Sequence, residues 1–223
     1  MSIYQMMLHF TLEWAMFSLS IGVDIKMYDS LRIAEIMESI LNYTSAVDSE
    51  LRNSLRDGLS SQQIDDYIQN MSIQIPSEVE ELYKWHDGMN DESRWENQRV
   101  LLYYHYFLPF SESLDIYYTW VKNRANEDLR LFPIFEFENE FYATSCSSTK
   151  QNSSPIYNVY GGSTIAYDSL KTMLMSILEC YESGAYQIGS DRWDLEIDEE
   201  RAAEIKLRWN PCRNTELSLF DHP

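Results

Sequence analysis

The feature that most constrains the fold is a run of predicted strands between residues 131 and 167, separated by short turns. Residues 131–138 end in an alternating pattern, with phenylalanines on one face and Glu136 and Glu138 on the other. A period of two is typical of a half-buried β-strand. Asn139 suits a tight turn, so the residues that follow are expected to return as the partner strand.

A second pair of strands is predicted in residues 155–160 and 163–167, around a Gly161–Gly162 turn. A serine- and threonine-rich loop at residues 145–154 separates the two pairs. Strands joined by such short connections pair antiparallel. The strand block therefore predicts an antiparallel sheet.

Helices are predicted before, within and after the strand block. Apolar residues recurring every three or four positions indicate helices at residues 29–43, 46–57, 60–71, 76–88, 111–121, 168–184 and 194–209. Ser60 and Gln63 have capping-box spacing, Asp168 or Ser169 can begin the last long helix, and Gly184 can end it. With a further strand at residues 99–107, this order predicts an α+β fold with a central antiparallel sheet and helices packed on one side.

Residues 75–90 are expected to link the helices to the sheet. Pro76 suits the first position of a helix, and Gly88 can adopt the left-handed conformation that ends one. Trp85 is expected to cover an edge of the sheet. Pro76, Trp85 and Gly88 are thus interpreted as structural landmarks, although residues 85–88 together also form a candidate recognition feature.

The charge of the chain restricts its partners. There are 36 acidic residues against 17 basic ones, a formal net charge of -19. Such a chain repels nucleic acid and anionic membrane surfaces and attracts basic proteins. Nucleic acid and membrane are therefore not expected as partners, and a basic protein is. Solubility alone is the alternative explanation of the acidity.

The cysteines and histidines do not predict a disulfide framework, a metal site or a cofactor. Cys146, Cys180 and Cys212 are odd in number and far apart, which favours a reducing, cytoplasmic setting. The four histidines have no ligand spacing. Residues 1–23 are largely apolar without an initial positive charge, so a buried helix or strand is favoured over a signal peptide or membrane anchor.

Six acidic residues are candidate contacts for a basic partner. They are Asp87, Asp91, Glu92, Glu136, Glu138 and Glu140. The first three are expected to be exposed at and beyond the end of the helix at residues 76–88. The last three are expected on the solvent face of the first hairpin. Plain solvation also explains each of them. Two facing carboxylates near aromatic residues would instead suit a glycosidase. Cys146 is expected to be an unreactive loop thiol, because no histidine is near it in the sequence.

The segment from residue 59 to residue 186 resembles the SUKH superfamily, also called the Smi/Knr family. The resemblance rests on an ordered set of short motifs: Ile75-Pro76, Leu82-Tyr83 with Trp85-His86-Asp87-Gly88, Leu108-Pro109-Phe110 with Ser113-Leu114, Leu131-Phe132-Pro133-Ile134, Phe141-Tyr142, Pro155-Ile156-Tyr157 and Ser169-Leu170. Family members usually have Gly or Asp in the turn that is Glu138-Asn139-Glu140 here. Residues 1–58 have no counterpart in the family core.

The resemblance implies a SUKH-like α+β domain at residues 59–186, between a mainly helical extension at residues 1–58 and an acidic, partly helical tail at residues 187–223. It implies a non-catalytic role without a cofactor. Bacterial members resemble immunity proteins that bind and neutralise a cognate toxin, often a nuclease. A regulatory or scaffold protein of the fungal cell-wall type is the alternative, and a carboxylate-dependent glycan enzyme is an alternative from another class. The sequence leaves the oligomeric state open.

Overall fold

The structure is a computed structural model. It describes residues 30–46, 48, 50–69, 73–90, 102, 105–123, 130–189 and 195–213. The chain divides into two units, Met1–Leu31 and Arg32–Pro223, and only residues 30 and 31 of the first are described. The expectation that the apolar N-terminus forms a buried helix or strand therefore lies outside the described residues.

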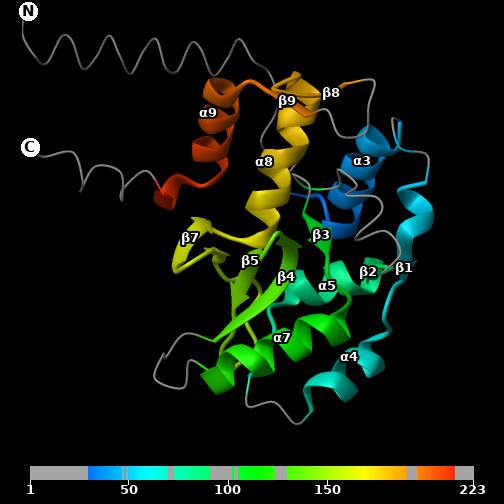
Figure 1. Cartoon of the computed structure of the whole chain (residues 1–223), viewed down its shortest axis with the longest axis vertical. Helices are drawn as coiled ribbons and strands as arrows, with labels where there is room; N and C mark the ends of the chain where they lie inside the picture. Colours follow the sequence, from blue (N-terminus) through cyan, green and yellow to red (C-terminus); the bar gives the residue numbers. More distant parts are fainter. Residues whose placement is uncertain are drawn as a thin grey trace, which may run out of the picture. The chain divides into compact units, whose positions relative to one another are not determined.

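A five-stranded antiparallel sheet forms the centre of the second unit (Figure 1). Its strands, in spatial order, are β3 (Tyr106–Phe107), β4 (Leu131–Phe137), β5 (Glu140–Ser145), β6 (Ile156–Val159) and β7 (Ser163–Tyr167). Strands β4 to β7 are neighbours in chain order, as predicted, and β3 pairs with β4 although a helix separates the two in the sequence. The predicted α+β fold with a central antiparallel sheet is confirmed.

Six helices and two small sheets complete the described part of this unit. The helices are α3 (Ile33–Ser45), α4 (Ser61–Ile68), α5 (Ser77–Trp85), α7 (Phe110–Asn123), α8 (Leu170–Ser183) and α9 (Glu199–Trp209). The small sheets pair β1 (Leu55–Asp57) with β2 (His86–Met89), and β8 (Tyr186–Ile188) with β9 (Leu195–Ile197). Helix α8 packs against both α3 and α9, so residues far apart in the sequence meet along it.

The core on one face of the sheet is aromatic. Tyr83 of α5 is fully buried, and its ring lies 4.8 Å from Phe110 and 5.3 Å from Phe107, centre to centre. Its hydroxyl donates to the carbonyl of Leu108 at 3.2 Å, so the one polar atom of the ring is satisfied. On the opposite face, Trp120 of α7 packs against a smaller buried cluster of Leu131, Ala143 and Val159.

Local capping signals in the sequence were accurate. Ser60 accepts from the backbone N–H of Gln63 at the start of α4, and the Gln63 side-chain oxygen accepts from the backbone N–H of Ser60 at 2.9 Å. At α8, Ser169 accepts from Thr172 N–H at 3.1 Å. Gly184 ends that helix in the left-handed conformation, with φ of 74°. The predicted start of α4 and both predicted ends of α8 are confirmed, whereas α4 ends at Ile68, before the predicted residue 71.

Residues 75–90 differ from the prediction at both ends of α5. Pro76 is the N-cap rather than the first helical residue, and the helix ends at Trp85, where the chain passes directly into β2. Gly88 therefore does not end the helix. It lies in β2 with φ of +73°, and a Cβ there would be 2.4 Å from the backbone nitrogen of Pro109. Its role is to let two backbone segments approach closely.

Trp85 and the segment before β1 also depart from expectation. The Trp85 indole N–H donates to the Glu38 carboxylate at 2.9 Å, so this side chain joins α5 to α3. The helix predicted for residues 46–57 is wrong. This segment instead contains a short 3₁₀ turn, Arg52–Ser54, and strand β1, because pairing with β2 outweighs a weak helical pattern.

The polar loop between β5 and β6 supplies hydrogen-bond acceptors to the N-terminus of α5. Ser77 N–H donates to the carbonyl of Gln151 at 2.9 Å, and Glu78 N–H donates to that of Asn152 at 3.1 Å. The first amides of a helix have no partner within it, so these bonds satisfy donors that would otherwise be unpaired. The loop thus positions α5 against the sheet.

Candidate functional site

Asp87 is buried, which corrects the expectation that it is exposed to a partner. Its side chain is only 4% accessible, and one of its carboxylate oxygens forms an ion pair with Arg56 at 2.9 Å. Its other carboxylate oxygen accepts from the Phe110 N–H at 2.8 Å, at the first residue of α7. Burial raises the pKa of Asp87, against the lowering effects of Phe110 N–H and Arg56. Asp87 thus caps the N-terminus of α7 from a distant part of the sequence.

The other candidate acids divide into two groups. Asp91 and Glu92 lie outside the described residues. Glu136 and Glu140 are half-buried in the β4–β5 hairpin, where Glu136 accepts from Asn139 N–H at 3.1 Å and Glu140 accepts from the Asn158 side chain at 2.5 Å. Glu136 therefore takes part in the hairpin's own hydrogen bonds, and Glu140 bonds to the neighbouring strand β6.

Glu138 is the exposed member of this group and lies in the turn between the two strands. Its φ is 48° and that of Asn139 is 68°. This conformation suits Asn or Gly and is unfavourable for glutamate. The β6–β7 turn lies at the same end of the sheet, because Val159 pairs with Phe141 near the start of β5.

The two turns together form a surface that we call the sheet tip, consisting of residues 138–139 and 160–162. All five residues are exposed. Tyr160 is the most exposed of the large hydrophobic side chains in the described part of the chain, with 72% of its surface accessible. An exposed tyrosine at the same end of the sheet as an exposed carboxylate is a combination suited to protein contact.

His105 is buried against strand β5 of the hairpin. Its ring stacks on Tyr142 with 4.5 Å between ring centres, and Nδ1 lies 3.2 Å from the carbonyl of Leu102. Burial lowers its pKa to about 4, and the nearby carboxylates of Glu140 and Glu136 oppose this effect. The neutral ring is therefore the form that the folded protein favours near neutral pH.

The hairpin acids do not provide the facing carboxylates that glycoside hydrolysis requires. Glu136 pairs with Phe141 and Glu140 pairs with Phe137, so the two glutamates point to opposite faces of the sheet. Burial also raises the pKa of the Cys146 thiol to about 12. A thiol with such a pKa is a poor nucleophile near neutral pH.

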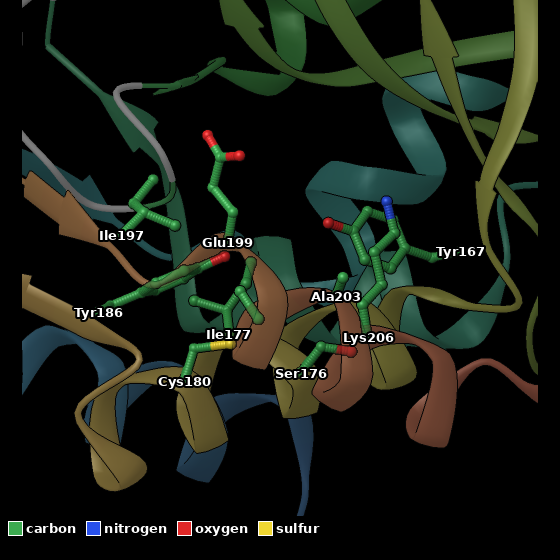
Figure 2. Close-up of a pocket in the computed structure, with 10 residues that line it drawn as sticks. Tyr167, Ser176, Ile177, Cys180, Tyr186, Ile197, Glu199, Ala203 and Lys206 are labelled. Atoms are coloured by element: carbon green, nitrogen blue, oxygen red, sulfur yellow. The ribbon is translucent and has the colours of Figure 1, made fainter.

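A cavity of about 290 Å³ lies between α8, α9 and the neighbouring strands (Figure 2). Its lining includes Tyr167, Ser176, Ile177, Cys180, Tyr186, Ile197, Glu199, Ala202, Ala203 and Lys206. On α9, Glu199, Ala203 and Lys206 lie on one helical face, since they are spaced four and three residues apart. In Figure 2 Glu199 lies beside Tyr186, and Lys206 lies beside Tyr167 at the other end of the opening.

Asn210 holds α9 in the position that forms this cavity. It is fully buried. Its side-chain oxygen accepts from Asp168 N–H at 2.9 Å and from the Thr172 hydroxyl at 2.8 Å, and its nitrogen donates to Ser176 Oγ at 3.2 Å. One amide thus joins the end of α9 to the first turns of α8. No motif in the sequence predicts this contact, because it joins residues that are far apart in the chain.

Lys206 is the unusual group in the cavity. Its ammonium lies 4.3 Å from the centre of the Tyr167 ring, a cation–π contact. Burial lowers its pKa. No carboxylate of the described residues lies within ion-pair distance of it, although the chain is strongly acidic. Sequence reasoning missed this site because it depends on how α8 and α9 pack.

Metal-binding clusters and membrane-spanning helices are both absent from the described residues. No group of three or more His, Cys, Asp or Glu side chains there could hold a metal ion. None of the helices in this part of the chain has the length and apolar character needed to cross a bilayer.

Comparison with known proteins does not assign the chain to a family. Its sequence matches no protein-family model and has no significant match among curated proteins.

Proposed function

We propose that the chain is a cytoplasmic, non-catalytic binding protein that neutralises a basic protein toxin by direct contact through the sheet tip. The observation that carries this proposal is the exposed pair of Glu138 and Tyr160 at one end of the sheet of a chain with a net charge of -19. The resemblance of residues 59–186 to immunity proteins of the SUKH superfamily suggests the class of partner. The three cysteines, all within the described residues, are not joined in disulfides, which suits a reducing compartment.

The unfavourable backbone conformation of Glu138 supports a functional role for its carboxylate. A non-glycine residue held at positive φ costs about 1–3 kcal/mol, and such residues cluster at functional sites. Asn or Gly at this position would relieve the strain, yet both would remove the carboxylate. Tyr160, at the same end of the sheet, adds an apolar ring of the kind that dominates binding energy at interfaces. Charge would speed association with a cationic partner, and the ring would slow dissociation.

The decisive experiment measures binding to the toxin domain encoded beside the gene of this protein. We expect a stoichiometric complex, suppression of the toxin's activity, and an affinity that falls as salt increases, because the acidic surface is screened. If no toxin is encoded there, or if no complex forms even at low salt, the proposal is wrong. Recovery of several unrelated partners would instead support the regulatory or scaffold function.

Matched variants test whether the sheet tip is the contact. Glu138→Gln keeps the backbone conformation and removes the charge, and Tyr160→Ala removes the ring. We expect Tyr160→Ala to weaken binding by about tenfold, since truncating a central anchor costs more than 1 kcal/mol. Glu200→Gln and Tyr118→Ala change an exposed acid on α9 and an exposed tyrosine on α7. If these controls weaken binding as much as the tip variants, the contact surface lies elsewhere.

A further inference from the structure

We propose that the cavity between α8 and α9 binds a small ligand with a carboxylate at one end, an apolar stem, and a cationic group at the other. Free arginine and the carboxy-terminal arginine of a peptide share this chemistry. The carboxylate would pair with Lys206, and the guanidinium would pair with Glu199. This site shares no residue with the sheet tip, so the inference does not depend on the proposed function.

The separation of the two charges determines the shape of the ligand. Glu199 and Lys206 lie seven residues apart on α9, which corresponds to about 10 Å along the helix axis. They do not form an ion pair with each other. A ligand whose opposite charges are adjacent cannot reach both groups. A ligand with several methylene groups between its charges can.

The size and lining of the cavity agree with an amino-acid-sized ligand. At about 290 Å³, the cavity lies at the lower end of the roughly 300–1,000 Å³ range of small-molecule sites. Ile177, Cys180 and Ala203 provide an apolar surface for the stem. Tyr186 lies beside Glu199 in Figure 2, where an aromatic ring can stack on a guanidinium.

The electrostatics at Lys206 favour an anion at that end. Its ammonium is half-buried and packs on Tyr167, while no carboxylate of the described residues offsets its charge. A bound carboxylate would stabilise the charged form of the lysine and oppose the effect of burial on its pKa. The hydrogen bonds of Asn210 hold both helices in place, so the cavity exists before the ligand arrives.

Calorimetric titration of the full chain tests the inference with four probes. These are L-arginine, a tripeptide ending in arginine, the same tripeptide with a carboxy-terminal amide, and agmatine, which is arginine without its carboxylate. We expect saturable binding of L-arginine or of the free-acid tripeptide, and the stronger of the two identifies the source of the ligand. The amide and agmatine should bind at least tenfold more weakly, because each lacks the charge that Lys206 recognises.

Variants locate the binding to the cavity. Lys206→Met keeps the packing stem, and Glu199→Gln keeps the shape, so each is expected to weaken binding about tenfold or more. Glu200→Gln makes the same charge change on α9 outside the cavity lining and should leave affinity unchanged. Lys206→Arg should restore binding, which separates loss of the cation from loss of folding. Absence of binding at millimolar concentrations, equal affinity for agmatine, or an equal effect of Glu200→Gln would overturn the proposal.

Discussion

His105 is expected to make the fold sensitive to acid. The ring is buried against Tyr142, and burial lowers its pKa to about 4, compared with an ordinary value of 6.5. Between these two pH values the unfolded chain binds a proton at this position and the folded protein does not. Stability from His105 is therefore complete above about pH 6.5 and is lost as the pH falls toward about 4.

The size of this effect follows from the two pKa values. At 1.36 kcal/mol per pKa unit, the difference between 6.5 and about 4 sets an upper limit of roughly 3 kcal/mol. Most of it, about 2.5 kcal/mol, falls between pH 7 and pH 4.5. That is a large share of the about 5–15 kcal/mol by which typical domains are stable.

The test compares urea unfolding of the wild-type protein and His105→Asn at pH 7 and pH 4.5. Asparagine can still donate to the Leu102 carbonyl but has no proton to gain. Carboxylates lose their contributions in both proteins, so the difference between the two pH-dependent losses isolates His105. We expect the wild-type protein to lose about 2.5 kcal/mol more than the variant. Equal losses would refute the reasoning, and the same substitution at the half-buried His86 provides a control.

Three further substitutions test the structure. Glu138→Asn should raise the free energy of unfolding by about 1 kcal/mol while weakening partner binding, and unchanged stability would contradict the strain argument. Gly88→Ala should destabilise by about 3 kcal/mol in a denaturant titration, because a Cβ there meets backbone atoms, whereas Gly162→Ala, with open space, should stay within about 0.5 kcal/mol. Asp87→Ala should lower the thermal midpoint by leaving the Phe110 N–H unpaired, at a cost of about 2 kcal/mol, with partner affinity unchanged for the folded fraction.

Features determined by neighbouring residues were predictable from the sequence. The hairpin around Asn139, the capping box at Ser60 and the left-handed end at Gly184 each depend on a few adjacent residues. The antiparallel sheet followed from them, because short turns leave no other pairing. In these places, local preference and tertiary structure agree.

Features determined by distant residues were not predictable. Strand β1 exists because β2 pairs with it, and Asp87 is buried because α7 begins beside it. The cavity forms only where α8 and α9 pack together. In the sequence, Lys206 cannot be distinguished from any other charged residue of a surface helix. No periodicity or spacing within a single segment carries that information.

The bonds from the loop after β5 to Ser77 and Glu78 have a consequence for how the protein opens. An isolated helix frays from its ends, so its first amides exchange quickly with solvent. Here those amides are held by carbonyls of Gln151 and Asn152 in the loop between β5 and β6. Their hydrogen exchange should therefore report the release of this loop from the sheet rather than helix fraying, so that α5 and the loop open as one cooperative unit.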